Sequence, residues 1–178
     1  MLILVMSCVA SAQTAPQMTT FRENEVKAVF LYNFMKFVEW PESVVPKGNA
    51  PLTLCVLGDD PFGRALDEAV AGEKVDSRSL VVKRFRRAED LSRCQLLFIS
   101  KSEAERQEVL LKKLEGSGTL TVGDDDDFLR QGGIIRLFVE NGHVRFEINA
   151  ERAKREGLKV SSNLLKLAKP VLSQAEGK

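Results

Sequence analysis

Histidine, tryptophan and tyrosine are scarce in this 178-residue chain, which has one of each, and there are only three cysteines. The single histidine, His143, lies beside the turn pair Asn141-Gly142. In a catalytic triad, a Ser or Cys nucleophile would have to use this histidine as its general base, and no local motif marks such a nucleophile. One histidine is also too few to complete a zinc site. The composition therefore predicts a protein that is not an enzyme and holds no cofactor or metal.

The chain also lacks an excess of charge of either sign, since it has 26 Lys+Arg and 25 Asp+Glu and a net charge of +1. No overall field draws such a chain to nucleic acid or to an anionic membrane. The basic cluster Lys83, Arg84, Arg86 and Arg87 is expected at a solvated strand end. Partners must therefore be recognised by local surfaces.

Two acidic motifs have the positions of ligand loops but lack the necessary residues. Gly58–Gly63 follows an apolar run, yet the Lys-Ser/Thr pair of a phosphate loop is missing. We expect Asp59 or Asp60 to cap a helix that begins at Pro61. Residues 124–127 are four consecutive aspartates without the alternating ligands of a calcium loop, so we expect a solvated helix N-terminus there.

Long hydrophobic runs are absent, and no segment approaches the roughly 20 apolar residues of a membrane helix. The short apolar run Leu2–Val9 precedes Ala10-Ser11-Ala12, the small-residue pattern of a signal peptidase site. The first basic residue is Arg22, and a start codon downstream of the true one explains the missing basic n-region. We predict a signal peptide over 1–12, a mature tail over 13–20, one domain over 21–172 and a disordered tail over 173–178. Lipidation at Cys8 is the alternative.

Cleavage after Ala12 would leave Cys55 and Cys94, an even count in an oxidising compartment. Both lie in or beside predicted strands and could meet across strand ends. Such a bond would close a loop of about 40 residues and contribute about 4 kcal/mol in the chain-entropy model. Two buried free thiols are the alternative.

Apolar runs and helical patterns alternate from residue 52 onward, which is typical of βαβ units and a largely parallel sheet. Ser102 and Glu105 form a capping box ahead of one such helix. Asn141-Gly142 predicts a tight antiparallel hairpin, and two short helices follow over 150–156 and after Ser161 or Ser162. We predict a single α/β domain, a mixed, mostly parallel sheet of about six strands with helices on both faces, in a Rossmann-like three-layer arrangement. The predicted strands are 52–57, 80–85, 96–99, 119–122, 134–139 and 144–148.

An N-terminal helix stopped by Trp40-Pro41 is apolar on nearly its whole circumference. Such a helix is either enclosed by its own domain or shared with a second chain. Its aromatic residues Phe30, Phe34 and Phe37 are therefore candidates for core packing and also for a homodimer interface.

The sequence resembles the YfiR family of small exported bacterial proteins. The resemblance covers most of the mature chain, and its strongest part is the last third. The matching segments are Phe37–Pro41, Leu54–Gly63, Gly132–Leu137, Val144–Asn149, Ala153, Gly157–Ser162 and Leu164–Ala168.

The resemblance implies a periplasmic repressor of a membrane-bound diguanylate cyclase, with an OmpA-like outer-membrane lipoprotein as a further partner. It also implies a Cys55–Cys94 bond, because the spacing matches a cysteine pair typical of the family. The alternative from the residues is a periplasmic small-molecule binding protein that uses the crevice at the carboxyl ends of the parallel strands.

Polar residues of the last hairpin and the next helix are either an ordinary salt-bridged surface or an interface rim. The resemblance favours the interface, because the family signature includes residues that match several of them. We predict that Arg145, Glu147, Asn149, Arg152 and Arg155 contact the partner.

Overall fold

The computed structural model describes residues 15–88, 91 and 93–171. The predicted signal peptide, the alternative lipid site at Cys8 and the predicted tail over 173–178 lie outside these residues. The elements are α1 (Ala15–Phe37), β1 (Val38–Glu39), β2 (Leu52–Leu57), α2 (Arg64–Val70), β3 (Lys74–Val75), β4 (Arg78–Phe85), β5 (Leu96–Ile99), the 3₁₀ helix η1 (Lys101–Arg106), α3 (Gln107–Lys113), β6 (Leu120–Gly123), β7 (Ile135–Glu140), β8 (His143–Ile148), α4 (Ala150–Arg155), β9 (Lys159–Val160) and α5 (Ser162–Leu167).

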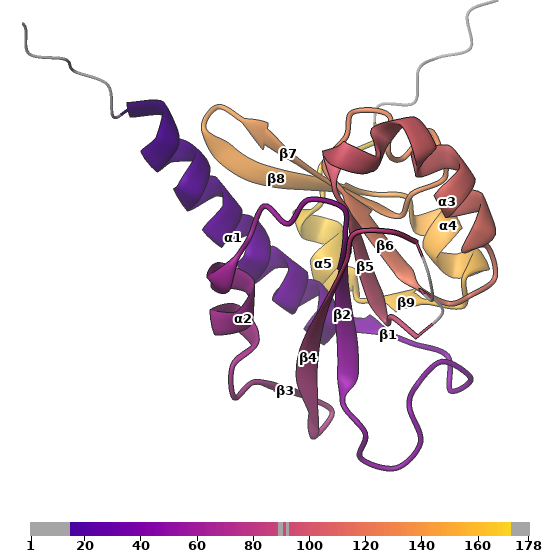
Figure 1. Ribbon diagram of the computed structural model, residues 1–178. Coiled ribbons are helices and arrows are strands. Elements are labelled where there is room, and N and C mark those ends of the chain that lie inside the picture. The colour runs from indigo at the N-terminus through magenta and orange to yellow at the C-terminus, as the bar shows by residue number, and fades with distance from the viewer. Residues whose placement is uncertain (1–14, 89–90, 92, 172–178) are drawn as a thin grey trace, which may run out of the picture.

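Within the described residues, seven strands form one sheet in the order β3-β4-β2-β5-β6-β7-β8 (Figure 1). The five central strands are parallel, and the edge strands β3 and β8 are antiparallel to their neighbours. The predicted mixed, mostly parallel sheet is confirmed. The additional strand is β3, which pairs with the start of β4 through only two residue pairs.

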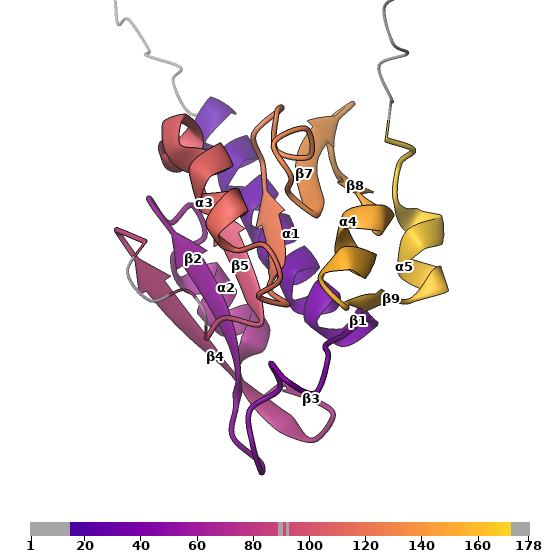
Figure 2. The same ribbon diagram turned by 90° about the vertical axis from the view of Figure 1, so that its right-hand side faces the viewer.

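Helices cover both faces of the sheet, as predicted, and Figure 2 shows α3 on one side of the strands with α1 and α2 on the other. Alternation along the strands divides the apolar residues between the two faces. On β2, Leu54 and Val56 pack in the cluster that contains α1 and α2, whereas Cys55 and Leu57 pack in the cluster that contains α3. Each face of the sheet thus has its own core.

The long helix α1 begins at Ala15, inside the segment predicted as a mature tail, and ends at Phe37. It ends three residues before Trp40, so the prediction that Trp40-Pro41 stops it is wrong. The reason is a tertiary contact, because Val38 and Glu39 pair with Val160 and Lys159 in a separate two-stranded sheet.

Two predicted helix starts are also wrong. Ser100, and not Ser102, caps η1, because the Ser102 hydroxyl accepts a hydrogen bond from the Asp59 N–H instead. Helix α2 begins at Arg64, three residues after Pro61. The Asp60 carboxylate accepts from Phe62 N–H in a local turn and from the Arg84 guanidinium, so it does not cap the helix.

Candidate interaction surface

The β7–β8 hairpin has the tight turn that Asn141-Gly142 predicts. Both residues have positive φ, 52° and 73°, which a two-residue turn of this kind requires. Glu140 and His143 pair directly beside the turn, and the register continues to Ile135 and Ile148. Alternate residues of β8 therefore face α1 or face away from it.

The α1-facing side of the hairpin packs on aromatic side chains of the helix. Phe146 contacts Phe30 and Phe34 edge to face, with ring centroids 5.4 and 5.3 Å apart. Phe34 is completely buried, so it has no surface with which to contact a second chain, and its assignment to an oligomer interface is wrong. Phe30 is partly buried and Phe37 is exposed.

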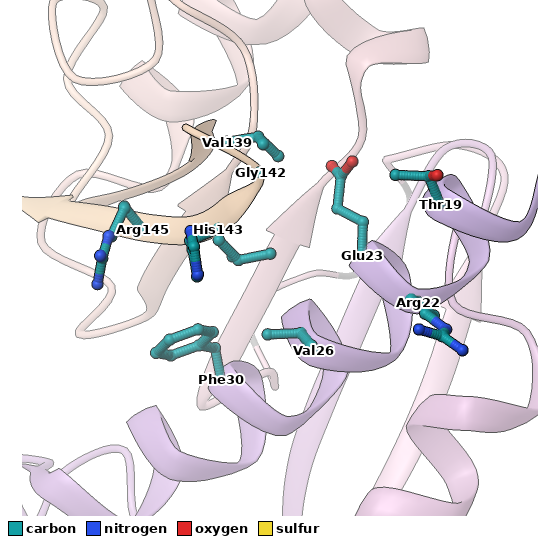
Figure 3. A pocket seen from close by; sticks show the side chains of 10 residues that line it. Thr19, Arg22, Glu23, Val26, Phe30, Val139, Gly142, His143 and Arg145 are labelled. Carbon is teal, nitrogen blue, oxygen red and sulfur yellow. The ribbon is translucent and has the colours of Figure 1, made fainter. Parts of the chain in front are cut away.

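A cavity of about 660 Å³ lies between the hairpin and the N-terminal half of α1 (Figure 3). Val26 and Phe30 line it from the helix, and Arg22 and Arg145 lie on opposite sides of it. Val26 and Val139 are each nearly half exposed, so they add apolar surface to this cavity. The cavity is lined by Thr19, Arg22, Glu23, Val26, Phe30, Val139, Gly142, His143, Val144 and Arg145.

On the other side of the hairpin, Glu147 is part of the domain's own ion-pair network. Its carboxylate accepts from Arg136 Nε at 3.1 Å, and only 13% of its side chain is exposed. Arg136 also donates to Asp126 at 2.7 Å. This pairing joins β7, β8 and the loop after β6.

Helix α4 is also tied to its surroundings. The Asn149 side chain caps it by accepting from Arg152 N–H at 2.9 Å. The Arg152 guanidinium pairs with Glu115 at 2.8 Å and with buried Glu156 at 2.9 Å, and its hydrogen bond lowers the pKa of Glu115. Arg155 is exposed.

Of the five predicted partner-binding residues, the structure thus leaves Arg145 and Arg155 exposed and engages Glu147, Asn149 and Arg152 within the domain. No ion pair of the described residues includes Arg145. Partner binding by all five stays a prediction.

A second cavity, of about 420 Å³, lies where strands β5 and β6 end. Lys101 follows β5 and Asp124 follows β6, so this is the crevice at the carboxyl ends of parallel strands. Lys27 of α1 reaches into it and pairs with Glu23 at 2.7 Å and with Asp124 at 2.9 Å. Burial lowers the pKa of Lys27, but the two carboxylates outweigh burial and raise it.

Sequence reasoning missed this buried lysine, although a lone cation among Val26, Ala28 and Val29 was a usable signal. Residues 124–127 lie in a turn segment and not at a helix N-terminus, so that prediction is wrong. Asp124 accepts from Lys27 and Asp126 from Arg136, which explains why this loop is acidic. Among the described residues, no group of three or more His, Cys, Asp or Glu is placed to hold a metal ion.

Cys55 and Cys94 form a disulfide with their Cα atoms 5.8 Å apart, which confirms the predicted pair. The bond joins Cys55 of β2 to Cys94, which comes just before the neighbouring strand β5. Both cysteines are buried. In the part of the chain that the structure describes, no helix has the length and apolar character to cross a bilayer.

A family model described as YfiR/HmsC-like matches residues 24–169, which is most of the chain. The chain belongs to the YfiR/HmsC-like family. YfiR-like proteins are periplasmic and regulatory rather than enzymatic, and the family is associated with control of diguanylate cyclases.

A solved structure, a conserved domain protein from Vibrio cholerae O1 biovar El Tor N16961, resembles this YfiR-like chain with a TM-score of 0.54 at 11% identity. The match covers 79% of this chain and 58% of that one. At this identity the likeness supports the fold alone.

Proposed function

We propose that this protein is a periplasmic repressor that binds the periplasmic sensor region of an inner-membrane diguanylate cyclase and holds the enzyme inactive. The result would be a lower level of cyclic di-GMP and less biofilm. Family membership over residues 24–169 carries this proposal. The exposed cavity beside the β7–β8 hairpin supports it, because an apolar recess beside arginines that have no ion pair among the described residues suits protein recognition.

The repressor would act by binding one conformation of the cyclase better than the other. About 5.5 kcal/mol of differential affinity moves a two-state enzyme from almost fully active to almost fully inactive. Release would follow when an OmpA-like outer-membrane lipoprotein sequesters the repressor, or when loss of the Cys55–Cys94 bond removes its folded form. We also propose a homodimer, for which Phe30 and Phe37 of α1 remain the candidate contacts.

The test is the intracellular level of cyclic di-GMP in the native host after deletion of the gene. We expect the level to rise and to fall again when an exported copy is restored. A copy without residues 1–12 is the matched control, because it should stay in the cytoplasm and fail to restore the low level. An unchanged level under several growth conditions would contradict repression.

The second cavity favours one other candidate function, the binding of a small molecule. Three cations and three carboxylates line that cavity, and among the described residues Lys101 has no ionic partner. A small charged metabolite would suit this crevice. Thermal shift against a metabolite library tests this, because a saturating ligand raises stability by kcal/mol amounts. A Lys101→Met variant should lose any shift that depends on the crevice.

A further inference from the structure

The outer edge of β8 carries backbone groups that the sheet does not use. The two-residue turn makes Glu140 and His143 a hydrogen-bonded pair, so every second residue of β8 directs its N–H and C=O to β7. The N–H of Asn149 donates to the carbonyl of Ile134 at 2.8 Å, which fixes the same alternation at the other end. Val144, between these points, must therefore direct its backbone groups outward.

The chain covers only part of this edge. The Lys169 N–H donates to the Phe146 carbonyl at 2.8 Å, and Lys169 forms an isolated parallel bridge to Glu147. Three groups remain without a partner among the described residues: the N–H and the C=O of Val144 and the N–H of Phe146. An uncovered edge of this kind is a template for another strand.

The uncovered edge lies beside the 660 Å³ cavity. Val144 faces α1, and Figure 3 shows Val26 and Phe30 on the helix across from the hairpin. A residue added opposite Val144 would place its side chain on this apolar side, against Val26 and Phe30.

The next position along β8 has the opposite character. Arg145 alternates with Val144 and so lies on the other face, exposed and without an ion pair among the described residues. A residue placed opposite Arg145 would gain most from a carboxylate, because opposite charges across neighbouring strands stabilise the pair. Arg22, at the far side of the cavity, adds positive charge at its rim.

We propose that the β8 edge accepts an extended segment of the partner protein as an additional strand, in which apolar and acidic residues alternate. Main-chain hydrogen bonds to Val144 would supply affinity, and the cavity and Arg145 would supply specificity. The identity of the partner rests on the function proposed above, whereas the strand-addition site does not.

The first experiment uses a blocked heptapeptide of alternating Val and Glu as the probe, with amide hydrogen exchange read by NMR. We expect the Val144 amide to exchange about tenfold more slowly with the peptide than without it. A peptide with Lys in place of Glu is the control and should protect this amide much less. No protection by the Glu peptide would overturn the proposal. Protection without peptide that grows with protein concentration would assign the edge to a second copy and also overturn it.

Two pairs of variants test the same site. Val144→Pro removes the outward N–H while leaving the β7 ladder intact, and it should weaken peptide binding at least about tenfold. Val82→Pro is its match, because Val82 also directs its N–H away from β2, on the part of β4 that β3 does not cover. Val26→Lys fills the cavity, and Val29→Lys changes a valine of similar exposure on the same helix that does not line it. Only the first member of each pair should lose binding.

The two proposals fail separately. If deletion of the gene raises cyclic di-GMP but Val144→Pro and Val26→Lys repress as well as the wild type at equal protein levels, strand addition is wrong and repression stands. If deletion has no effect, repression is wrong, and the peptide experiment still decides strand addition. Thermal denaturation of each variant shows whether it is folded, and the Val26→Lys pair decides the matter if Val144→Pro does not fold.

Discussion

The ring of Phe128 lies directly against the α-carbon of Gly133. The other edge of the same ring lies against Gly123, so the two glycines enclose a side chain that is completely buried. A Cβ at either glycine would overlap the ring. Gly133 belongs to the Gly-Gly pair at the start of the family-like C-terminal segment, and this contact is a physical reason for a glycine at that position.

We expect Gly133→Ala to lower the free energy of unfolding by about 3 kcal/mol, because the ring must shift in a packed core. Urea denaturation measures this. The double variant with Phe128→Leu should recover part of the loss, since a smaller side chain leaves room for the new methyl group. Equal costs for Gly133→Ala with Phe128 or Leu at that position would mean that the ring is not the cause.

The disulfide should be a major contributor to stability, because it constrains a 39-residue separation in the unfolded chain. We expect the double variant Cys55→Ala and Cys94→Ala to lose about 4 kcal/mol in the chain-entropy model. Thermal denaturation with and without dithiothreitol measures this. The reductant should lower the melting temperature of the wild type and leave that of the double variant unchanged.

The Lys27 ammonium is 7% exposed and balances two carboxylates, so Lys27→Met should cost about 2 to 3 kcal/mol by leaving Glu23 and Asp124 uncompensated. Lys36→Met, at an exposed position of the same helix, should change stability by less than about 0.5 kcal/mol. Urea denaturation of both variants at neutral pH compares them. Equal effects would show that the buried ion pairs do not stabilise the fold.

The same ion pairs predict a pH dependence. The pKa of Lys27 is raised above its ordinary value of 10.5, so the folded state holds this proton more tightly than the unfolded state. The stabilisation by these ion pairs is therefore complete below pH 10.5 and disappears as the pH rises through the raised pKa of Lys27. Wild type and Lys27→Met should differ in stability at about pH 9 and converge as the pH rises above 10.5 through the raised pKa. A constant difference would contradict this assignment.

Arg152 and Arg155 lie on the same helix, and we expect a structural role for Arg152 and an interface role for Arg155. Arg152→Met should lower the free energy of unfolding by about 2 kcal/mol, because Glu156, 4% exposed, would lose its cation. Arg155→Met should leave stability unchanged within about 0.5 kcal/mol and weaken partner binding. Chemical denaturation and a pull-down with the cyclase's periplasmic region measure the two effects. Unchanged binding would remove Arg155 from the interface.

Local sequence signals were enough for six of the seven strands of the large sheet. A short apolar run bounded by proline and glycine, such as Leu52–Leu57, favours a strand buried on both faces, and Asn141-Gly142 determines its own turn because both residues accept positive φ. The helix starts were less predictable. Ser102 and Asp60 have side chains that can cap a helix, but these side chains accept hydrogen bonds from other groups. The Ser102 hydroxyl accepts from the Asp59 N–H, and the Asp60 carboxylate accepts from the Arg84 guanidinium.

The sequence by itself determined the strand pattern, the hairpin, the family and the pair of cysteines available for a bond, because these depend on local periodicity and composition. Only the tertiary structure decided which charged residues are used within the domain and which remain exposed. Glu147 and Arg145 are two residues apart on one strand, yet only Glu147 faces a residue of opposite charge on β7. Charge pairing depends on register and on distant loops, and the chain brings those together only when it folds.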